Sequence, residues 1–575
     1  MNQAYIQIKV KNGNNEVDVN GVQEQNLLDI LHKNNIIIPN PCHGNGTCGK
    51  CKIKVLSGNL PITEADERIL SKNELKQGIR LACKANIGKK QEEHKTKLKQ
   101  GTKEICAEKA DETALEELRI EVLEKSEENI IVQGIARIED KRDCGKEEQN
   151  KSKNCFIAID IGTTTIAMVL VEEETGKIID TYTSLNHQRK YGADVISRIV
   201  AANDGKLEEL KQLIEEDLWK GICRLISVDV NLTQVVIAGN TTMVHLLMGY
   251  SCLPLGKYPF YSEHLEEIDF LYNKKEMENE YRKIPITILP GISAFVGGDI
   301  VAGILACPGF ETEEICLLVD LGTNGEMVLG NDEKLIVTST AAGPAFEGGN
   351  ITHGTASIPG SIEKVKIQNQ KAIVKTINNK MPPIGICGTG IISAVAQLKK
   401  SKMIDSNGNL RYPYSEKGFS LWTQENGEKI VIYQKDIREF QMAKSAIRAG
   451  IEILMEEYGC DSKDVKHIYL AGGFGTHLSE EDVLDVGIFP KEWSGRIVPI
   501  GNGALQGAIQ IGKVKVAERE KVLKWNQSNE EILKTDMKIR NGEYQKINNI
   551  IKNAKAVSLA DHKKFQEKYL KYMNF

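Results

Sequence analysis

The sequence contains 575 residues, which exceeds what a single hydrophobic core supports and predicts about three to four domains. Its 41% hydrophobic and 27% charged residues are typical of soluble globular proteins, and a net charge of −5 argues against nucleic-acid or anionic-membrane binding. We expect a cytoplasmic protein, because no signal peptide or membrane span of roughly 18 apolar residues is evident and many of the thirteen cysteines are scattered, as in a reducing compartment.

Residues 1–92 have the pattern of a small α+β domain. Residues 5–10 alternate apolar and polar side chains, Asn12-Gly13 is a hairpin turn signal, and residues 16–19 form the returning strand. We expect a short helix around residues 27–31, a strand at 52–56, and a helix at 65–75 that leads to Cys83.

Cysteines in this domain follow the spacing C-x5-C-x2-C-x31-C, with three of them in one glycine-rich loop. An iron–sulfur cluster needs four thiolates that converge on a small volume, and glycines let a loop turn tightly around it. The predicted cluster ligands are Cys42, Cys48, Cys51 and Cys83.

Other interpretations of these cysteines fit less well. Structural zinc sites usually combine two short C-x2-4-C units, whereas only Cys48 and Cys51 form one here. A disulfide framework suits small secreted domains, and four unrelated core cysteines would not need this spacing. A [2Fe–2S] cluster is favoured over [4Fe–4S], because the latter prefers C-x2-C-x2-C-x3-C-P. The loop resembles those of plant-type and adrenodoxin-type ferredoxins, and its first gap matches the latter.

Residues 93–153 are rich in lysine and glutamate. We interpret them as a charged linker that tethers the cluster domain, or as a small connecting domain whose strands would use apolar residues between 118 and 138. The sequence leaves both alternatives open.

A strand followed by a small, hydroxyl-rich turn occurs twice after residue 154. Asp160 and Asp320 each end an apolar strand and precede a Gly-Thr pair, and a second strand follows each turn. Two long segments that open with the same hairpin indicate a duplicated domain.

Such hairpins are suited to phosphate binding. The glycine lets the backbone approach a phosphate, the turn amides and hydroxyls donate to its oxygens, and the aspartate holds Mg²⁺ directly or through water. A P-loop, G-x4-G-K-[ST], does not occur in the sequence.

A third glycine-rich element follows a predicted strand at 468–471. Gly472, Gly473 and Gly475 would let a flat base lie against the backbone, although for this element taken alone close packing of a strand on a helix is the favoured reason for glycine. Residues 502–504 open a helix of small residues, and the charged run 515–575 has a helical pattern. We expect its end, 565–575, to be an amphipathic helix that docks on its own domain rather than a nucleic-acid contact.

Taken together, these motifs resemble those of the reductive activators of corrinoid proteins, which join a [2Fe–2S] ferredoxin domain to an actin-like ATPase. The matching stretches are the two hairpins and residues 186–195, 238–242, 290–299, 342–348, 386–390 and 471–475. The resemblance implies an α+β ferredoxin-like (β-grasp) domain at 1–92, a linker at 93–153, and a duplicated α/β actin-like (ASKHA, ribonuclease H-like) ATPase. Its lobe I would span 154–314, and its lobe II, with a C-terminal helical tail, would span 315–575.

The resemblance also implies a function. The protein would use Mg²⁺ and ATP to pass an electron from its [2Fe–2S] cluster to the inactive Co(II) form of a corrinoid protein, restoring Co(I) for methyl transfer. An electron donor such as a ferredoxin or flavodoxin and a homodimer are implied as well. Asp160 and Asp320 would be catalytic, and the ATP-binding residues would be Gly162, Thr163, Thr164, Thr165, Asn240, Thr241, Gly322, Thr323, Asn324, Gly325, Gly472, Gly473 and Gly475.

Three other functions compete with this one. A small-molecule kinase of the same superfamily would use Asp194 or Asp299 as a base, although either carboxylate could instead line the nucleotide cleft or cap a helix. An activator of the 2-hydroxyacyl-CoA dehydratase type would carry a [4Fe–4S] cluster shared between subunits. A redox sensor would bind ATP as a switch without catalysis.

Overall fold

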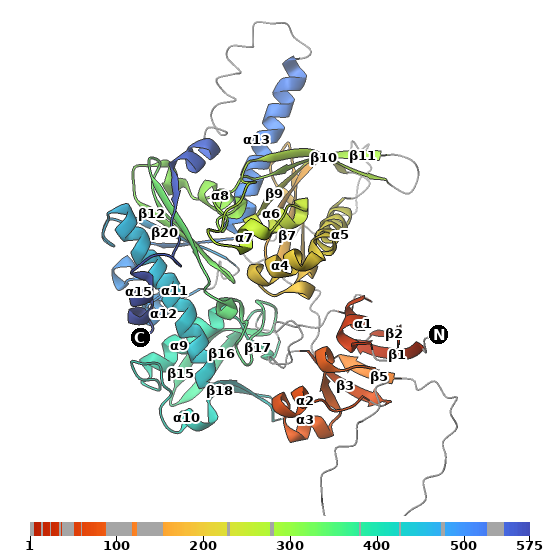
Figure 1. Cartoon of the computed structure of the whole chain (residues 1–575). Coiled ribbons are helices and arrows are strands. Elements are labelled where there is room, and N and C mark those ends of the chain that lie inside the picture. The colour runs from red at the N-terminus through yellow and green to blue at the C-terminus, as the bar shows by residue number, and fades with distance from the viewer. Residues whose placement is uncertain are drawn as a thin grey trace, which may run out of the picture. The chain divides into compact units, whose positions relative to one another are not determined.

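A computed structural model describes most of the chain (Figure 1). The described residues are 5–12, 15–22, 25–33, 36, 51–58, 60–87, 118–122, 153–226, 230–275, 281–378, 381–424, 427–472, 478–525 and 546–575. They form two compact units, one containing residues 1–128 and 187–201 and the other residues 129–186 and 202–575.

The first unit contains a five-stranded sheet in the order β2-β1-β5-β3-β4. Its elements are β1 (Tyr5–Asn12), β2 (Asn15–Val22), α1 (Leu27–Lys33), β3 (Lys52–Ser57), α2 (Glu64–Ile69), α3 (Lys72–Lys76), β4 (Ile79–Leu81) and β5 (Leu118–Val122). The predicted strands and the helix at 27–31 are therefore confirmed.

The fifth strand corrects the expected end of this domain. β5 comes from the range assigned to the linker, yet it lies between β1, to which it is parallel, and β3, to which it is antiparallel. Leu118 and Ile120 are buried in the same core as Ile8 and Val10, which explains why this short apolar stretch joins the sheet.

The single helix expected at 65–75 is two helices. Thr63 caps α2 and Ser71 caps α3, and each forms a capping box with the acidic residue three positions later, Asp66 and Glu74. The second capping box starts a new helix where the apolar pattern alone predicts a continuous one.

The first unit also includes α4 (Val195–Ala201). The Asp194 carboxylate precedes α4 and accepts hydrogen bonds from the backbone N–H of Ser197 at 2.9 Å and from its hydroxyl at 2.8 Å. Asp194 thus caps a helix, one of the two alternatives to a role as a kinase base.

The second unit begins with a six-stranded sheet in the order β10-β11-β9-β6-β7-β8. Its strands and helices are β6 (Lys153–Ile161), β7 (Thr165–Glu172), β8 (Ile178–Leu185), α5 (Leu207–Leu225), β9 (Val230–Gly239), α6 (Thr241–Met248), α7 (Leu253–Gly256), β10 (Ile268–Lys275), β11 (Tyr281–Ile288) and α8 (Gly298–Leu305). We call this part lobe I.

A second six-stranded sheet has the order β21-β20-β12-β13-β14-β22 and forms lobe II. Its strands are β12 (Cys316–Leu321), β13 (Gly325–Gly330), β14 (Leu335–Thr340), β20 (His467–Ala471), β21 (Ile497–Gly501) and β22 (Ala554–Ala556). The registers repeat those of lobe I: Asp160 lies opposite Ala238 of the parallel strand β9, and Asp320 lies opposite Ala471 of the parallel strand β20. The predicted duplication is confirmed.

Smaller elements complete lobe II. They are β15 (Ser361–Gln368), β16 (Lys371–Thr376), β17 (Gly385–Ile386), α9 (Gly388–Lys400), α10 (Tyr414–Lys417), β18 (Phe419–Thr423), β19 (Lys429–Ile432), α11 (Gln434–Tyr458), α12 (Glu480–Val486) and α15 (Phe565–Tyr572). The C-terminal α15 packs on α11, where the rings of Phe440 and Phe575 stack 6.2 Å apart, so the expected docking of the tail on its own domain is confirmed.

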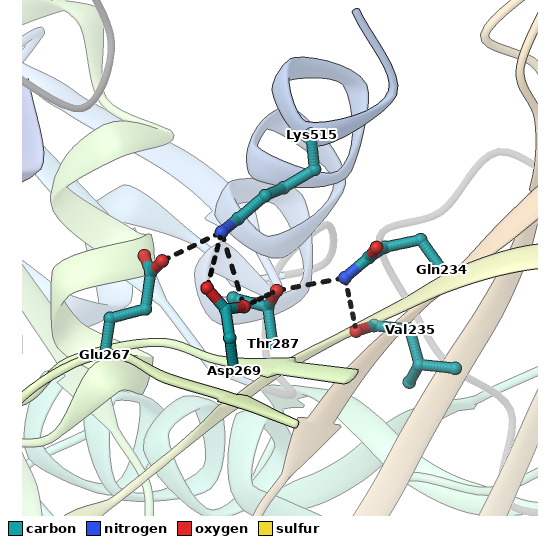
Figure 2. Close-up of polar contacts among 6 residues, drawn as sticks. All are labelled: Gln234, Val235, Glu267, Asp269, Thr287 and Lys515. Atoms are coloured by element: carbon teal, nitrogen blue, oxygen red, sulfur yellow. Dashed lines mark hydrogen bonds and ion pairs between the residues drawn. The ribbon is translucent and has the colours of Figure 1, made fainter. Parts of the chain in front are cut away.

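Helix α13 (Gly503–Trp525) follows β21 of lobe II but packs on α8, β9 and β6 of lobe I (Figure 1). Figure 2 shows how it is held there: Lys515 Nζ lies 2.8 Å from Glu267 and 3.3 Å from Asp269. Thr287 donates to Asp269 and accepts from Gln234 at 2.9 Å, which connects α13 to β10, β11 and β9. The helix therefore links the two lobes.

In the described part of the chain, no helix has the length and apolar character that crossing a membrane would require.

Candidate functional site

Each of the two predicted phosphate hairpins closes its turn with a hydrogen bond from its glycine, and the turn of the second hairpin is one residue shorter. The backbone N–H of Gly162 donates to the Thr165 carbonyl at 2.9 Å, and that of Gly322 donates to the Asn324 carbonyl at 3.0 Å. A Cβ atom at Gly162 would lie 2.7 Å from the Thr165 oxygen, so the first turn closes this tightly only with glycine.

Carboxyl groups gather where the two hairpins meet. Asp160 and Asp320 are the penultimate residues of β6 and β12, with Asp320 opposite Glu326 of β13, and Asp299 lies in the first turn of α8. Solvent reaches part of each aspartate, but all four groups lie deep among protein atoms, and charges within the cluster contribute to the raised pKa values of Asp299, Asp320 and Glu326. In the described part of the chain none of the four forms a salt bridge with a lysine, arginine or histidine.

Withdrawal from bulk water is the main cause of these raised pKa values. It raises the pKa of Asp160 to about 6, and together with the charge of Asp160 it raises the pKa of Asp299 to about 7. The pKa of Asp320 is raised to about 8 by burial and by Asp299, Asp160 and Glu347, and the pKa of Glu326 also lies well above its ordinary range. A cluster of this kind fits a divalent cation, which would stabilise the ionised carboxylates.

Asn502 completes the cluster from the far end of the sequence. Its side-chain amide donates to Asp160 Oδ2 at 2.7 Å, while its carbonyl oxygen accepts from the Leu505 N–H at 2.7 Å. The residue that starts α13 thereby connects lobe II to the catalytic aspartate predicted in lobe I.

The hairpin hydroxyls are connected by Glu347. Its Oε2 atom accepts from Thr164 Oγ1 at 3.3 Å and from Thr323 Oγ1 at 2.6 Å, so one carboxylate joins the turns of both lobes. Thr163 is engaged differently, since it accepts from Asn240 Nδ2 at 3.2 Å.

Asn240 and Thr241 lie at the start of α6. The Asn240 side chain caps this helix by accepting from the Met243 N–H at 2.9 Å, and Thr241 Oγ1 donates to the Ser293 carbonyl at 2.7 Å. A Cβ atom at Gly297 would lie 2.5 Å from the Thr241 nitrogen, which shows how closely the 290–299 loop approaches this helix.

Of the three glycines predicted to bind adenosine after β20, the structure describes only Gly472. Gly472 has φ +114°, a conformation that favours glycine, and the ideal position of its Cβ is 2.7 Å from the Leu321 carbonyl and 3.3 Å from Asp320 Oδ1. The element thus starts beside the second hairpin. Gly473 and Gly475 lie outside the described residues, and the adenosine role of all three stays a prediction.

Two of the four predicted cluster ligands are described. Cys51 and Cys83 are 1% and 6% exposed, and the Ala82 N–H donates to the Cys51 carbonyl at 2.9 Å. Cys51 directly precedes β3, and Cys83 lies in the short 3-10 helix Ala82–Lys84 that directly follows β4. Pairing of β3 with β4 therefore brings Cys51 and Cys83 together despite 31 intervening residues. Cys42 and Cys48 lie outside the described residues.

Across the residues that the structure describes, no three His, Cys, Asp or Glu side chains are grouped so as to hold a metal ion by themselves. Mg²⁺ keeps several of its water ligands in proteins, so carboxylates can hold it through water. Asp299, the other aspartate considered as a kinase base, belongs to this cluster.

Three residues of the site were not predicted: Glu326, Glu347 and Asn502. Glu347 lies in the stretch 342–348 and Asn502 opens the small-residue helix, so both were visible as motifs, but nothing in the sequence shows which side chains they reach. Glu326 could have been found from the hairpin register, because it faces Asp320 across β12 and β13.

Models of three protein families match most of the chain. Residues 10–87 match the 2Fe-2S iron-sulfur cluster binding domain, residues 155–310 match the RACo middle region, and residues 314–575 match the C-terminal domain of RACo, the ASKHA domain. These matches confirm the predicted ferredoxin-like and actin-like fold classes.

Relatives with named activities are similar over part of their length. The chain is 36% identical to the corrinoid activation enzyme RamQ of Eubacterium limosum over 61% of this chain and 63% of RamQ. It is 26% identical to the [Co(II) methylated amine-specific corrinoid protein] reductase of Methanosarcina barkeri, over 62% of this chain and 69% of that protein. A solved structure, the reductive activator for corrinoid, iron-sulfur protein, shares the fold with a TM-score of 0.62 at 24% identity, over 99% of this chain and 98% of that one.

Proposed function

We propose that this chain, which matches the RACo middle region and the C-terminal domain of RACo behind a 2Fe-2S domain, is an ATP-dependent reductive activator of a corrinoid protein. In this function it passes one electron to the inactive Co(II) form of its partner and restores Co(I) for methyl transfer. The names of two relatives, a corrinoid activation enzyme and a Co(II) corrinoid protein reductase, support this substrate class.

One observation carries the proposal: the same chain contains a 2Fe-2S domain and a duplicated pair of hairpins whose turns face a carboxyl cluster. A kinase or a nucleotide switch needs only the second part, and a simple ferredoxin needs only the first. A protein that couples ATP to electron transfer needs both.

The hairpin residues would bind Mg²⁺ and the phosphates of ATP. The turn amides and the hydroxyls of Thr163, Thr164 and Thr323 would donate to phosphate oxygens, and Asp160 and Asp320 would hold the cation through its water ligands. Asn502 would orient Asp160 through its 2.7 Å hydrogen bond, which favours the ionised form of Asp160 and so opposes the effect of burial on its pKa. Gly472, Gly473 and Gly475 would accommodate the adenosine.

Cys42, Cys48, Cys51 and Cys83 would hold the cluster, which supplies a one-electron carrier when bound. Burial of Cys51 and Cys83 separates their thiolates from water, and the 2.9 Å backbone hydrogen bond beside them fixes two of the four ligand positions. The solvent exposure of a cluster is one of the factors that set its potential.

ATP has a clear thermodynamic task in this scheme. Plant-type ferredoxins have potentials near −400 mV, and each ~59 mV by which the acceptor is harder to reduce lowers a one-electron equilibrium about tenfold. ATP can offset such a gap only by favouring a state of the protein in which the partner is bound differently. Helix α13, which leaves lobe II and packs on lobe I, would transmit a change between the lobes. We include in the proposal a ferredoxin or flavodoxin as donor, a homodimer and a cytoplasmic location.

The test is reduction of a Co(II) corrinoid protein by the purified chain with a reductant and MgATP, followed by the Co(I) absorption spectrum. Cys51→Ser should abolish reduction but leave ATP hydrolysis in place, whereas Asp320→Asn should abolish both. Cys223→Ser, at an exposed position, is the matched control and should retain full activity. Undiminished Co(II) reduction by Cys51→Ser would exclude the electron route.

A further inference from the structure

Glu347 occupies a position in the site that its place in the sequence does not reveal. Its carboxylate accepts hydrogen bonds from Thr164, in the turn of the lobe I hairpin, and from Thr323, in the turn of the lobe II hairpin. These are two of the hydroxyls that the proposed function assigns to phosphate. In this structure a carboxylate takes their hydrogen bonds and joins the lobes.

The backbone around Glu347 is built to hold that carboxylate in place. It ends a single helical turn, Pro344–Glu347, between Gly343 at φ +80° and Gly348 at φ +79°. A Cβ atom at Gly348 would lie 2.3 Å from the Thr355 carbonyl, and the neighbouring Phe346 is 1% exposed in the core. The turn is thus fixed on both sides.

The carboxylate also lies beside the second hairpin. The ideal Cβ position of Gly322 is 3.6 Å from Glu347 Oε1, and the Glu347 charge contributes to the raised pKa of Asp320. A phosphate that received hydrogen bonds from Thr164 and Thr323 would therefore have to take the place of this carboxylate, because both groups are anions and both need the same donors.

We propose that Glu347 is a latch between the lobes that the terminal phosphate of ATP displaces. Without nucleotide, Glu347 joins the two hairpins. With ATP bound, the terminal phosphate takes over both hydroxyls and Glu347 moves away. With ADP, which lacks that phosphate, Glu347 returns. This inference rests on the proposed function in that it takes ATP as the ligand, and it makes Glu347 a positioning residue that distinguishes ATP from ADP.

The experiment measures binding of MgATP and MgADP by calorimetry to the full chain and to Glu347→Ala. Removal of the displaced anion should tighten ATP binding on the order of tenfold and leave ADP binding within about twofold. Glu333→Ala removes an exposed glutamate of the same lobe and should change neither affinity.

Glu347→Gln is the control for a folding defect in Glu347→Ala. Its amide oxygen can accept from both threonines, so the turn should stay folded in a thermal melt, while the repulsion between carboxylate and phosphate is removed. ATP binding should tighten in this variant too, by less than in Glu347→Ala, because competition for the two hydroxyls remains.

A second measurement reads the displacement directly. In the wild-type chain, backbone hydrogen exchange of residues 344–348 should be faster with MgATP than with MgADP, and this difference should vanish in Glu347→Ala.

The outcomes separate the latch from the function on which it rests. Unchanged or weaker ATP binding by Glu347→Ala, or an equal gain for ATP and ADP, overturns the latch while wild-type ATP binding keeps the proposed function. If neither the wild type nor Glu347→Ala binds ATP, both the latch and the ATP dependence are wrong. ATP binding by the variant alone would support the latch in its strongest form.

Discussion

The amide of Asn502 donates to the carboxylate of Asp160 at 2.7 Å, although 342 residues separate them in the sequence. Asn502 directly follows β21 of lobe II, and Asp160 is the penultimate residue of β6, the first strand of lobe I. The hydrogen bond joins the lobes at the carboxyl cluster and favours the ionised form of Asp160.

Asn502→Ala should lower ATP hydrolysis on the order of ten- to a hundredfold, because Asp160 loses its orienting donor. Loss of that donor should also raise the pKa of Asp160 above about 6, so the rising limb of the pH–rate profile should move to higher pH. Gln506→Ala removes a hydrogen bond in the first turns of the same helix, from Gln506 to the Ile500 carbonyl, and should leave the profile in place. An unshifted profile in Asn502→Ala would contradict this role.

The carboxyl cluster should make stability depend on pH. The pKa of Asp320 is raised from 3.8 to about 8, so the folded chain holds a proton that the unfolded chain has released between these values. The contribution of Asp320 to the free energy of unfolding should therefore fall as pH rises from about 4 to 8, by at most about 1.4 kcal/mol per pH unit.

Urea unfolding in EDTA at pH 5.5, 7.0 and 8.5 measures this contribution as the difference between wild type and Asp320→Asn. The variant should be increasingly more stable than the wild type as pH rises, and Mg²⁺ should reduce the difference by binding the ionised wild-type cluster. A difference independent of pH would show that Asp320 is already ionised at pH 5.5.

Sequence reasoning predicted the local parts of this site better than its assembly. The hairpins at Asp160 and Asp320 were predictable because strand, turn and hydroxyl residues are contiguous, and the hairpin repeats. Glu347 and Asn502 were not, because their partners are set by the meeting of two sheets. A threonine turn gives no sign that a distant carboxylate will occupy it.

The N-terminal domain shows the same limit. Its first strands follow from short-range alternation, but β5 belongs to a stretch separated from Cys83 by a charged segment, and its place between β1 and β3 depends on long-range pairing. The Lys515 network is similar: a lysine in a charged helix looks exposed in the sequence, and only the packing of α13 on lobe I explains its partners.

Lys515→Met should destabilise the chain by roughly 1–3 kcal/mol. The Lys515 side chain is 13% exposed and faces Glu267, 20% exposed, so removal of its charge leaves a poorly hydrated carboxylate without this partner (Figure 2). Denaturant unfolding measures the loss. Lys513→Met, at an exposed position two residues earlier on α13, is the control and should change stability by less than about 0.5 kcal/mol. Equal effects of the two substitutions would mean that the ion pairs do not anchor the helix.

The position of β5 leads to a prediction about the smallest cluster-binding fragment. A fragment of residues 1–92 lacks the strand that lies between β1 and β3, so it would expose Ile8, Val10 and Ile53 of the sheet core. A fragment of residues 1–128 keeps that strand. After iron–sulfur reconstitution, 1–128 should show the absorption spectrum of a [2Fe–2S] protein and a cooperative thermal transition, and 1–92 should lose the transition and most of the bound iron. In the fragment of residues 1–128, Ile120→Asp places a charge at a fully buried position and should reproduce the loss of the thermal transition and of bound iron. Glu121→Gln, on the same strand, is the control for the effect of any substitution in β5. A stable, iron-replete 1–92 would show that the linker strand is dispensable and would restore the boundary at residue 92.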